Sequence, residues 1–115
     1  MTKLIKLEPV FKEIVWGGNR LKSDYGFESD LKNIAEAWML CARKDGANTV
    51  VNGEYSGMSF TELVKANRQL LGKKGASYEE FPLLIKFIDA KADLSVQVHP
   101  DDEYAKLHEN SYGKT

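Results

Sequence analysis

The chain has 115 residues, which is enough for one domain and too few for two. A composition of 43% hydrophobic and 29% charged residues with a net charge of -1 excludes a disordered, collagen-like or coiled-coil chain, and it makes nucleic acid a poor partner. A single cysteine fits a reducing compartment, and without an apolar run of membrane-spanning length or a signal peptide we expect a cytoplasmic protein with no membrane partner.

Strands dominate the elements that we predict for the first half of the chain. Residues 4–15 look extended and end in a turn at 16–18, where two glycines follow a tryptophan. A polar loop is predicted for residues 19–33. The short apolar run at 34–41 favours a strand, although its length alone also allows a helix. The β-branched residues 49–51 indicate another short strand.

A helix is predicted to begin at Ser59. Ser59 and Glu62 have the spacing of a capping box, in which each side chain bonds a backbone N–H of the other residue. Apolar residues then recur with a helical period as far as Leu71. Gly72 is a plausible end of this helix.

The last third of the chain predicts two strands and a short helix. Residues 82–88 form a strongly apolar segment, and residues 89–93 are predicted to turn the chain. Residues 94–99 alternate strictly between apolar and polar side chains, which is typical of a strand. Pro100 and the acidic residues after it favour the beginning of a helix.

The alternating segment is also the most informative for function. Ser95, Gln97 and His99 share one face of the predicted strand. Gln97 and His99 are two residues apart, so their side chains would lie about 6–7 Å apart and could converge on one ion. Imidazole suits zinc, and an amide oxygen is an acceptable harder ligand. The alternative is a strand with a polar face turned to solvent.

Lys86 is the only charged residue in the apolar segment 82–88, so it must reach water, a partner or a ligand. A turn at residues 90–93 would place it opposite Gln97, and a turn at 89–93 opposite Val96. The sequence leaves this register open. A lysine that simply extends its ammonium group to solvent is an equally good interpretation.

Three further residues have ordinary structural interpretations. Cys41 has no second cysteine and is expected to be a small buried residue. His108 is expected on the surface of the last helix. Glu36 could be a buried functional acid, but an inter-strand polar contact is the interpretation that we favour.

Residues 94–100, with the sequence LSVQVHP, resemble the zinc-binding strand of type I mannose-6-phosphate isomerases in their shorter bacterial form. Three other stretches resemble the same family in the expected order. They are residues 14–18 with Leu21, residues 34–38 and residues 82–86. The resemblance covers the whole chain.

This resemblance implies a mainly β fold, an incomplete cupin-like double-stranded β-helix (jelly roll) with short helical insertions. Residues 1–115 would be the N-terminal portion of the isomerase catalytic domain. The implied reaction interconverts mannose 6-phosphate and fructose 6-phosphate with Zn²⁺ as cofactor. By resemblance, Gln97 and His99 are zinc ligands, and Lys86, Ser95 and Lys114 bind the sugar phosphate substrate.

The family pattern continues beyond this chain. A glutamate ligand is expected directly after residues 113–115, and the family's histidine ligand, catalytic base and catalytic arginine are expected further downstream. The isolated chain is therefore expected to be inactive and to self-associate through exposed sheet edges. The alternative is a non-catalytic cupin fragment that binds sugar phosphate or acts as an assembly module.

Overall fold

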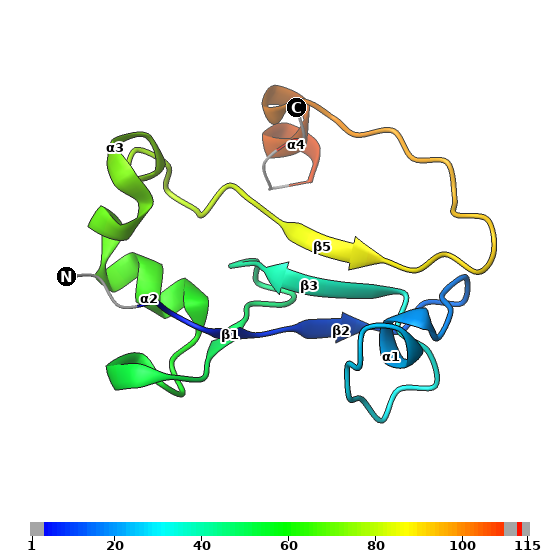
Figure 1. Cartoon of the computed structure of the whole chain (residues 1–115). Coiled ribbons are helices and arrows are strands. Elements are labelled where there is room, and N and C mark those ends of the chain that lie inside the picture. The colour runs from blue at the N-terminus through cyan, green and yellow to red at the C-terminus, as the bar shows by residue number, and fades with distance from the viewer. Residues whose placement is uncertain (1–3, 110–112, 114–115) are drawn as a thin grey trace.

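A three-stranded antiparallel sheet forms the centre of the fold (Figure 1). The computed structural model describes residues 4–109 and Gly113. Strand β3 (Glu36–Leu40) lies in the middle, with β2 (Val10–Lys12) on one side and β5 (Ile85–Ile88) on the other. The strands predicted at 34–41 and 82–88 are thereby confirmed with shorter bounds.

A second sheet has two strands, β1 (Leu7–Glu8) and β4 (Thr49–Val50), which pair antiparallel. The helical segments are all short: α1 (Arg20–Ser23), η1 (Gly53–Tyr55), α2 (Phe60–Ala66), η2 (Arg68–Leu71), α3 (Gly72–Gly75) and α4 (Asp102–His108). Among the described residues, none of these helices has the length and apolar character needed to cross a membrane.

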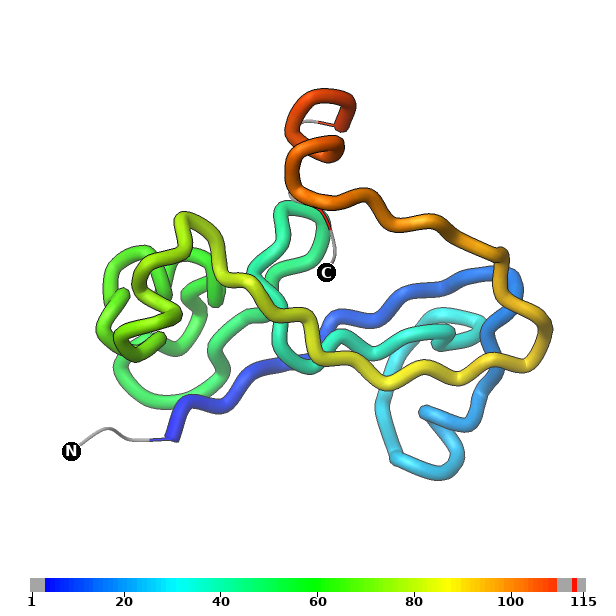
Figure 2. The backbone as a smooth tube through the Cα atoms, turned by 90° about the horizontal axis from the view of Figure 1, so that it is seen from above, coloured from blue at the N-terminus to red at the C-terminus, as the bar shows by residue number. Residues whose placement is uncertain are grey.

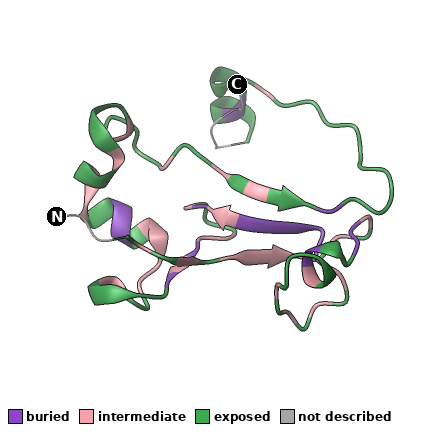
Figure 3. Cartoon of the chain, viewed as in Figure 1, coloured by how far each residue is buried: buried purple, intermediate pink, exposed green. Residues whose placement is uncertain are grey.

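The hydrophobic core lies against one face of the central sheet. Leu21, Ile34 and Ala37 are its buried members, and three partly buried residues pack on them: Phe11, Phe27 and Met39. Figure 3 shows burial concentrated on β3, the strand with a neighbour on each side. Side chains alternate along a strand, so the residues between the core-facing ones point to the opposite face of the sheet.

The predicted helix at Ser59 is confirmed at its N-terminus and is shorter than expected. The Ser59 hydroxyl accepts a hydrogen bond from the Glu62 amide at 3.2 Å. Helix α2 ends at Ala66, because Asn67 leaves the helical region with a φ of −134° and its side chain donates to the Leu63 carbonyl. The remaining apolar residues of the pattern fall in the separate 3₁₀ turn η2.

Two helix starts differ from the prediction. Helix α1 begins at Arg20, inside the stretch expected to be a loop. Helix α4 begins at Asp102 and not at Pro100, since the Asp101 carboxylate accepts from the Tyr104 amide at 2.9 Å and caps the helix. An aspartate cap satisfies one of the unpaired N–H groups of the first turn, which fixes the start of the helix.

The prediction of a strand at residues 94–99 was wrong. The segment has no ladder partner among the described residues and no assigned strand. Val96 and Val98 are 98% and 93% exposed, so the apolar face of the alternation is not covered. Both registers considered for Lys86 were wrong as well, because residues 94–99 do not pair with β5; the residue opposite Lys86 is Trp38 of β3.

The path of the chain after β5 explains this error. Ala90 forms a β-bridge with Gly17, and the amides of Lys91 and Ala92 donate to the Trp16 carbonyl at 2.8 and 3.1 Å. These contacts hold the chain at the end of the sheet, so it does not turn back beside β5. Figures 1 and 2 both show the following segment running back at a distance from β5.

The predicted glycine turn is confirmed. The Gly17 amide donates to the Ile14 carbonyl at 2.9 Å, which closes the turn. A Cβ atom on Gly17 would lie 2.6 Å from the Ala35 Cα, and one on Gly18 would lie 2.6 Å from a carboxylate oxygen of Asp89. The two glycines therefore allow a close backbone approach that larger residues would prevent.

Candidate functional site

Lys86 and Glu36 form an ion pair across strands β5 and β3. The Lys86 ammonium donates to Glu36 Oε1 at 3.0 Å. The Glu36 side chain is only 10% exposed, whereas that of Lys86 is 31% exposed. The inter-strand polar contact favoured for Glu36 is thus confirmed, and its partner is the lysine that the sequence marked as unusual.

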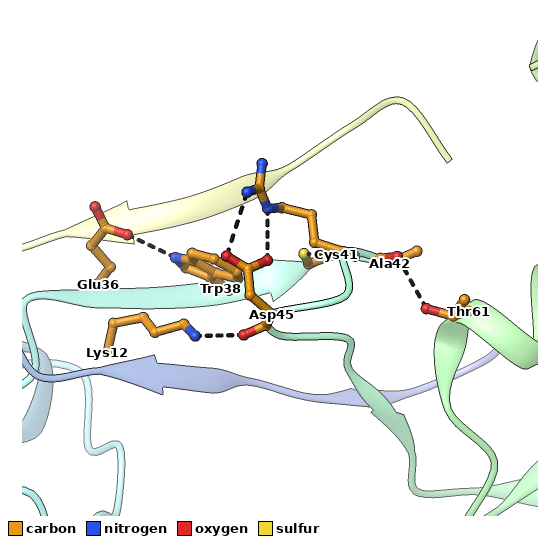
Figure 4. A network of polar contacts seen from close by, with 8 residues as sticks. Lys12, Glu36, Trp38, Cys41, Ala42, Asp45 and Thr61 are labelled. Atoms are coloured by element: carbon orange, nitrogen blue, oxygen red, sulfur yellow. Dashed lines mark hydrogen bonds and ion pairs between the residues drawn. The ribbon is translucent and has the colours of Figure 1, made fainter. Parts of the chain in front are cut away.

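The second oxygen of the Glu36 carboxylate is also engaged. The Trp38 indole N–H donates to Glu36 Oε2 at 2.7 Å (Figure 4). Both oxygens of a buried carboxylate are therefore hydrogen-bonded, which offsets part of the cost of removing it from water. Glu36 and Trp38 lie two residues apart on one face of β3, and Lys86 reaches this face from β5.

The Lys86 ammonium has hydrogen-bonding capacity beyond this pair. A lysine carries three N–H donors, and among the described residues one of them bonds Glu36. The partly exposed ammonium can therefore also bond water or an anionic ligand. This arrangement suits the binding of a phosphate or of sugar oxygens through charge-assisted hydrogen bonds.

The metal-ligand candidates lie on the extended segment after β5. The Gln97 amide nitrogen donates to the Ser95 hydroxyl at 3.4 Å, so these two side chains meet on one side of the segment. This contact leaves the Gln97 amide oxygen as the atom that a cation would use. His99 is exposed. The donor types fit zinc, but they supply two ligands where a tetrahedral site needs four.

The described residues do not complete this set of ligands. Within residues 4–109 and Gly113, no group of three or more His, Cys, Asp or Glu side chains could hold a metal ion. Lys114 lies outside the described residues. In the part of the chain that the structure describes, no hydrogen bond joins Lys86 to Ser95 or Gln97, so a common pocket stays a prediction.

Trp38 is the member of this cluster that reasoning from sequence missed. Its ring is buried, with the Lys12 ammonium 4.4 Å from the ring centroid and the backbone of Gly46 packed against the ring edge. The available signal was the two-residue spacing from Glu36, which places both side chains on one face of a strand. That spacing indicates proximity but does not specify a hydrogen bond.

Residues 4–114 match the family described as "Phosphomannose isomerase type I, catalytic domain". The chain belongs to this family. The phosphomannose isomerase match includes every candidate site residue from Glu36 to Lys114, so the recognition made from the LSVQVHP segment is confirmed.

Curated phosphomannose isomerases are similar to the whole chain. The "Probable mannose-6-phosphate isomerase GmuF" and the "Mannose-6-phosphate isomerase ManA", both of Bacillus subtilis strain 168, are each 44% identical to it. The matches cover 100% and 99% of this chain and 36% of each relative. The chain therefore spans little more than a third of the length of these relatives.

A solved phosphomannose isomerase has the same fold. The mannose 6-phosphate isomerase from Bacillus subtilis superimposes with a TM-score of 0.88 at 41% identity, over 95% of this chain and 34% of that protein. The expected fold class is thereby confirmed as mainly antiparallel β with short helices, corresponding to part of a cupin-type fold.

Proposed function

We propose that this chain supplies part of the active site of a zinc-dependent mannose-6-phosphate isomerase, which interconverts mannose 6-phosphate and fructose 6-phosphate. The observation that carries the proposal is the match to the catalytic domain over residues 4–114. The Lys86–Glu36 pair supports it, because a partly exposed ammonium group is held in a fixed place on the sheet.

In this proposal Lys86 and Ser95 bind the sugar phosphate, together with Lys114. The Lys86 ammonium contributes charge-assisted hydrogen bonds to phosphate or sugar oxygens. Glu36 holds Lys86 in position, since one of its oxygens accepts from Lys86 and the other from Trp38. The base that carries the proton between the two sugar carbons is proposed to lie outside this chain.

Gln97 and His99 are the proposed zinc ligands of this chain. When bound, the ion would stabilise the negative charge that develops on the sugar oxygens during isomerisation. Two ligands alone give a weak site, so the proposal requires further ligands from residues beyond Thr115.

The direct test is a chimaeric enzyme. The 115 residues replace the matching segment of Bacillus subtilis ManA, and a coupled assay follows conversion of mannose 6-phosphate to fructose 6-phosphate with zinc. We expect turnover by the chimaera. His99→Ala should lower both zinc content and rate, whereas Lys86→Met should raise KM about 10-fold with zinc content unchanged.

Two controls define the outcomes of this test. Unaltered ManA shows that the assay works, and a circular dichroism spectrum with a cooperative melt shows that the chimaera folds. A folded chimaera that binds zinc and shows no turnover contradicts the proposal. Turnover that is indifferent to Lys86→Met would remove this lysine from the substrate site.

A non-catalytic role remains as the second candidate. It requires only the partly exposed Lys86 ammonium, which Glu36 holds in place. A fragment of this kind would bind mannose 6-phosphate and release it unchanged. Phosphorus NMR on the folded, zinc-loaded chimaera distinguishes the two candidates, because the isomerase proposal expects fructose 6-phosphate to form and the non-catalytic role expects only bound mannose 6-phosphate.

A further inference from the structure

We propose that Trp38 is a positioning residue of this site. Its indole N–H fixes the carboxylate of Glu36, and the carboxylate in turn fixes the ammonium group of Lys86. The inference rests on the proposed function in one respect, namely that Lys86 binds the substrate. The arrangement of the three side chains stands without that function.

The first argument is the geometry at the carboxylate. Trp38 Nε1 bonds Oε2 at 2.7 Å, and Lys86 Nζ bonds Oε1 at 3.0 Å. A carboxylate held at one oxygen can still rotate about its terminal bond, where the torsional preference is broad. Bonds to both oxygens remove that rotation. Trp38, two residues from Glu36 on the same face of β3, therefore sets the position of Lys86 through the Glu36 carboxylate.

The second argument is that the indole itself cannot turn away. The Lys12 ammonium lies 4.4 Å from the ring centroid and also donates to the Asp45 carbonyl at 2.7 Å (Figure 4). A Cβ atom on Gly46 would lie 2.8 Å from the ring, so the backbone there already touches it. A cation over an indole face is attractive. The loop and Lys12 together direct the N–H toward Glu36.

The third argument concerns cost. A buried indole needs one hydrogen-bond acceptor, and a backbone carbonyl would satisfy it. Burying a carboxylate beside an ammonium is expensive and is often no better for stability than an apolar pair. Packing alone therefore gives no reason for this combination of Trp38, Glu36 and Lys86. Orientation of the lysine does.

The first test uses the 115-residue chain itself. Trp38→Phe keeps an aromatic ring and removes the N–H. Nitrogen-15 relaxation of the Lys86 ammonium and its hydrogen exchange with water report how firmly the group is held. We expect lower order and exchange that is about 10-fold faster in Trp38→Phe, because the carboxylate is free to rotate. Trp16→Phe is the matched control and should leave Lys86 unchanged.

An unchanged Lys86 signal in folded Trp38→Phe overturns the inference. Should Trp38→Phe fail to fold, Lys12→Met decides the question. This variant removes the ammonium group that lies over the Trp38 ring, so the ring is held less firmly, and it keeps the indole N–H. We then expect the same loss of Lys86 order at smaller amplitude. No change in folded Lys12→Met would equally overturn the inference.

The second test is a double-mutant cycle in the ManA chimaera. Trp38→Phe should raise KM for mannose 6-phosphate about 10-fold with kcat little changed, and it should add almost nothing when Lys86 is already methionine. Additive effects would mean that Trp38 acts on folding and not through Lys86. A parent chimaera that folds, binds zinc and shows no turnover would refute the proposed function, and the lysine NMR would still decide the inference.

Discussion

Glu36 and Lys86 face different environments although they form one ion pair. The carboxylate lies among packed side chains, and the ammonium reaches the surface. Interaction with solvent weakens the attraction at the lysine end, so the pair contributes modestly to stability. The same openness lets the lysine meet a ligand without breaking its bond to Glu36. At the scale of single residues, the buried Glu36 anchors the pair in the sheet, and the partly exposed Lys86 is available for the proposed substrate.

Cys41 is a second residue whose surroundings determine its chemistry. It is fully buried, and burial raises the pKa of its thiol. Because the thiolate is the reactive form, we expect alkylation by iodoacetamide at pH 8 to be at least about 100-fold slower in the native chain than in urea. The measurement is unambiguous, since Cys41 is the only cysteine.

The same shift predicts the sign of a pH effect. The fold favours the neutral thiol, so its contribution to stability is complete below the ordinary thiol pKa of about 8.5 and is lost as the pH rises above it. Cys41→Ala should reduce that alkaline loss in urea unfolding. Equal alkylation rates in native and unfolded chain would contradict the burial of this thiol.

At the scale of elements, the turn at Gly17 is the contact that directs the chain after β5. Gly17→Ala would force a Cβ against the Ala35 backbone, and overpacking of this kind costs about 1–3 kcal/mol. We expect urea unfolding to show this loss. Amide hydrogen exchange at Lys91 and Ala92 should also accelerate, because both amides bond the Trp16 carbonyl.

Gly26→Ala is the control for this change. Gly26 has a φ of +70°, and a Cβ atom there would meet no other atom within 4 Å, so alanine adds only backbone strain. Exchange at Lys91 and Ala92 should then keep its native rate. If Gly17→Ala leaves those two amides protected, the turn does not hold the chain after β5.

The elements differ in how well local sequence could predict them. The cap at Ser59 and the apolar strands at 34–41 and 82–88 depend on neighbouring residues, so they were visible. The segment 94–99 was misassigned because alternation tells which side chains share a face and not which strand is the partner. Helix α1 was missed because four residues carry no period.

The residues of the candidate site also differ in how well local sequence could predict them. Lys86 was identified because a charge in an apolar strand is locally anomalous. Its partner Glu36 lies 50 residues away, and only the strand register brings the two together. The hydrogen bond from Trp38 depends on a rotamer set by Lys12 and Gly46, which no local pattern encodes. The ligand roles of Gln97 and His99 remain predictions.

For the whole molecule, the first prediction concerns activity. The 115-residue chain alone, assayed with zinc and mannose 6-phosphate, should show no turnover above background. Two metal donors hold zinc weakly, and loss of one positioned electrostatic group alone costs about 10²–10³ in rate. Clear turnover by the purified chain would refute the argument that its site is incomplete. ManA under the same conditions is the positive control.

The second prediction concerns self-association. Strand β5 is an edge strand within the described residues, and its three apolar side chains are about half exposed: Ile85, Phe87 and Ile88. Its one charged residue, Lys86, is paired with Glu36, and a largely apolar edge is prone to pair with another strand. We propose that copies associate along this edge, so light scattering should show a mass that rises with concentration.

A matched pair of variants locates the contact. Ile85→Lys places a charge on the edge and should shift the chain toward monomer. Val15→Lys adds the same charge at an exposed residue outside the strands and should not. A chain that stays monomeric at high concentration would contradict the proposal. Dimers that are equally sensitive to both variants would place the contact elsewhere.

The central place of β3 also has a consequence for the order of folding during synthesis. Its partner β5 follows roughly 50 residues later, and Phe87 of β5 stacks on Tyr25 and lies against Phe27. A ribosome adds about 5–20 residues per second, so β3 waits several seconds with one edge unpaired. The nascent chain is therefore most open to chaperone binding just before Ile88 emerges.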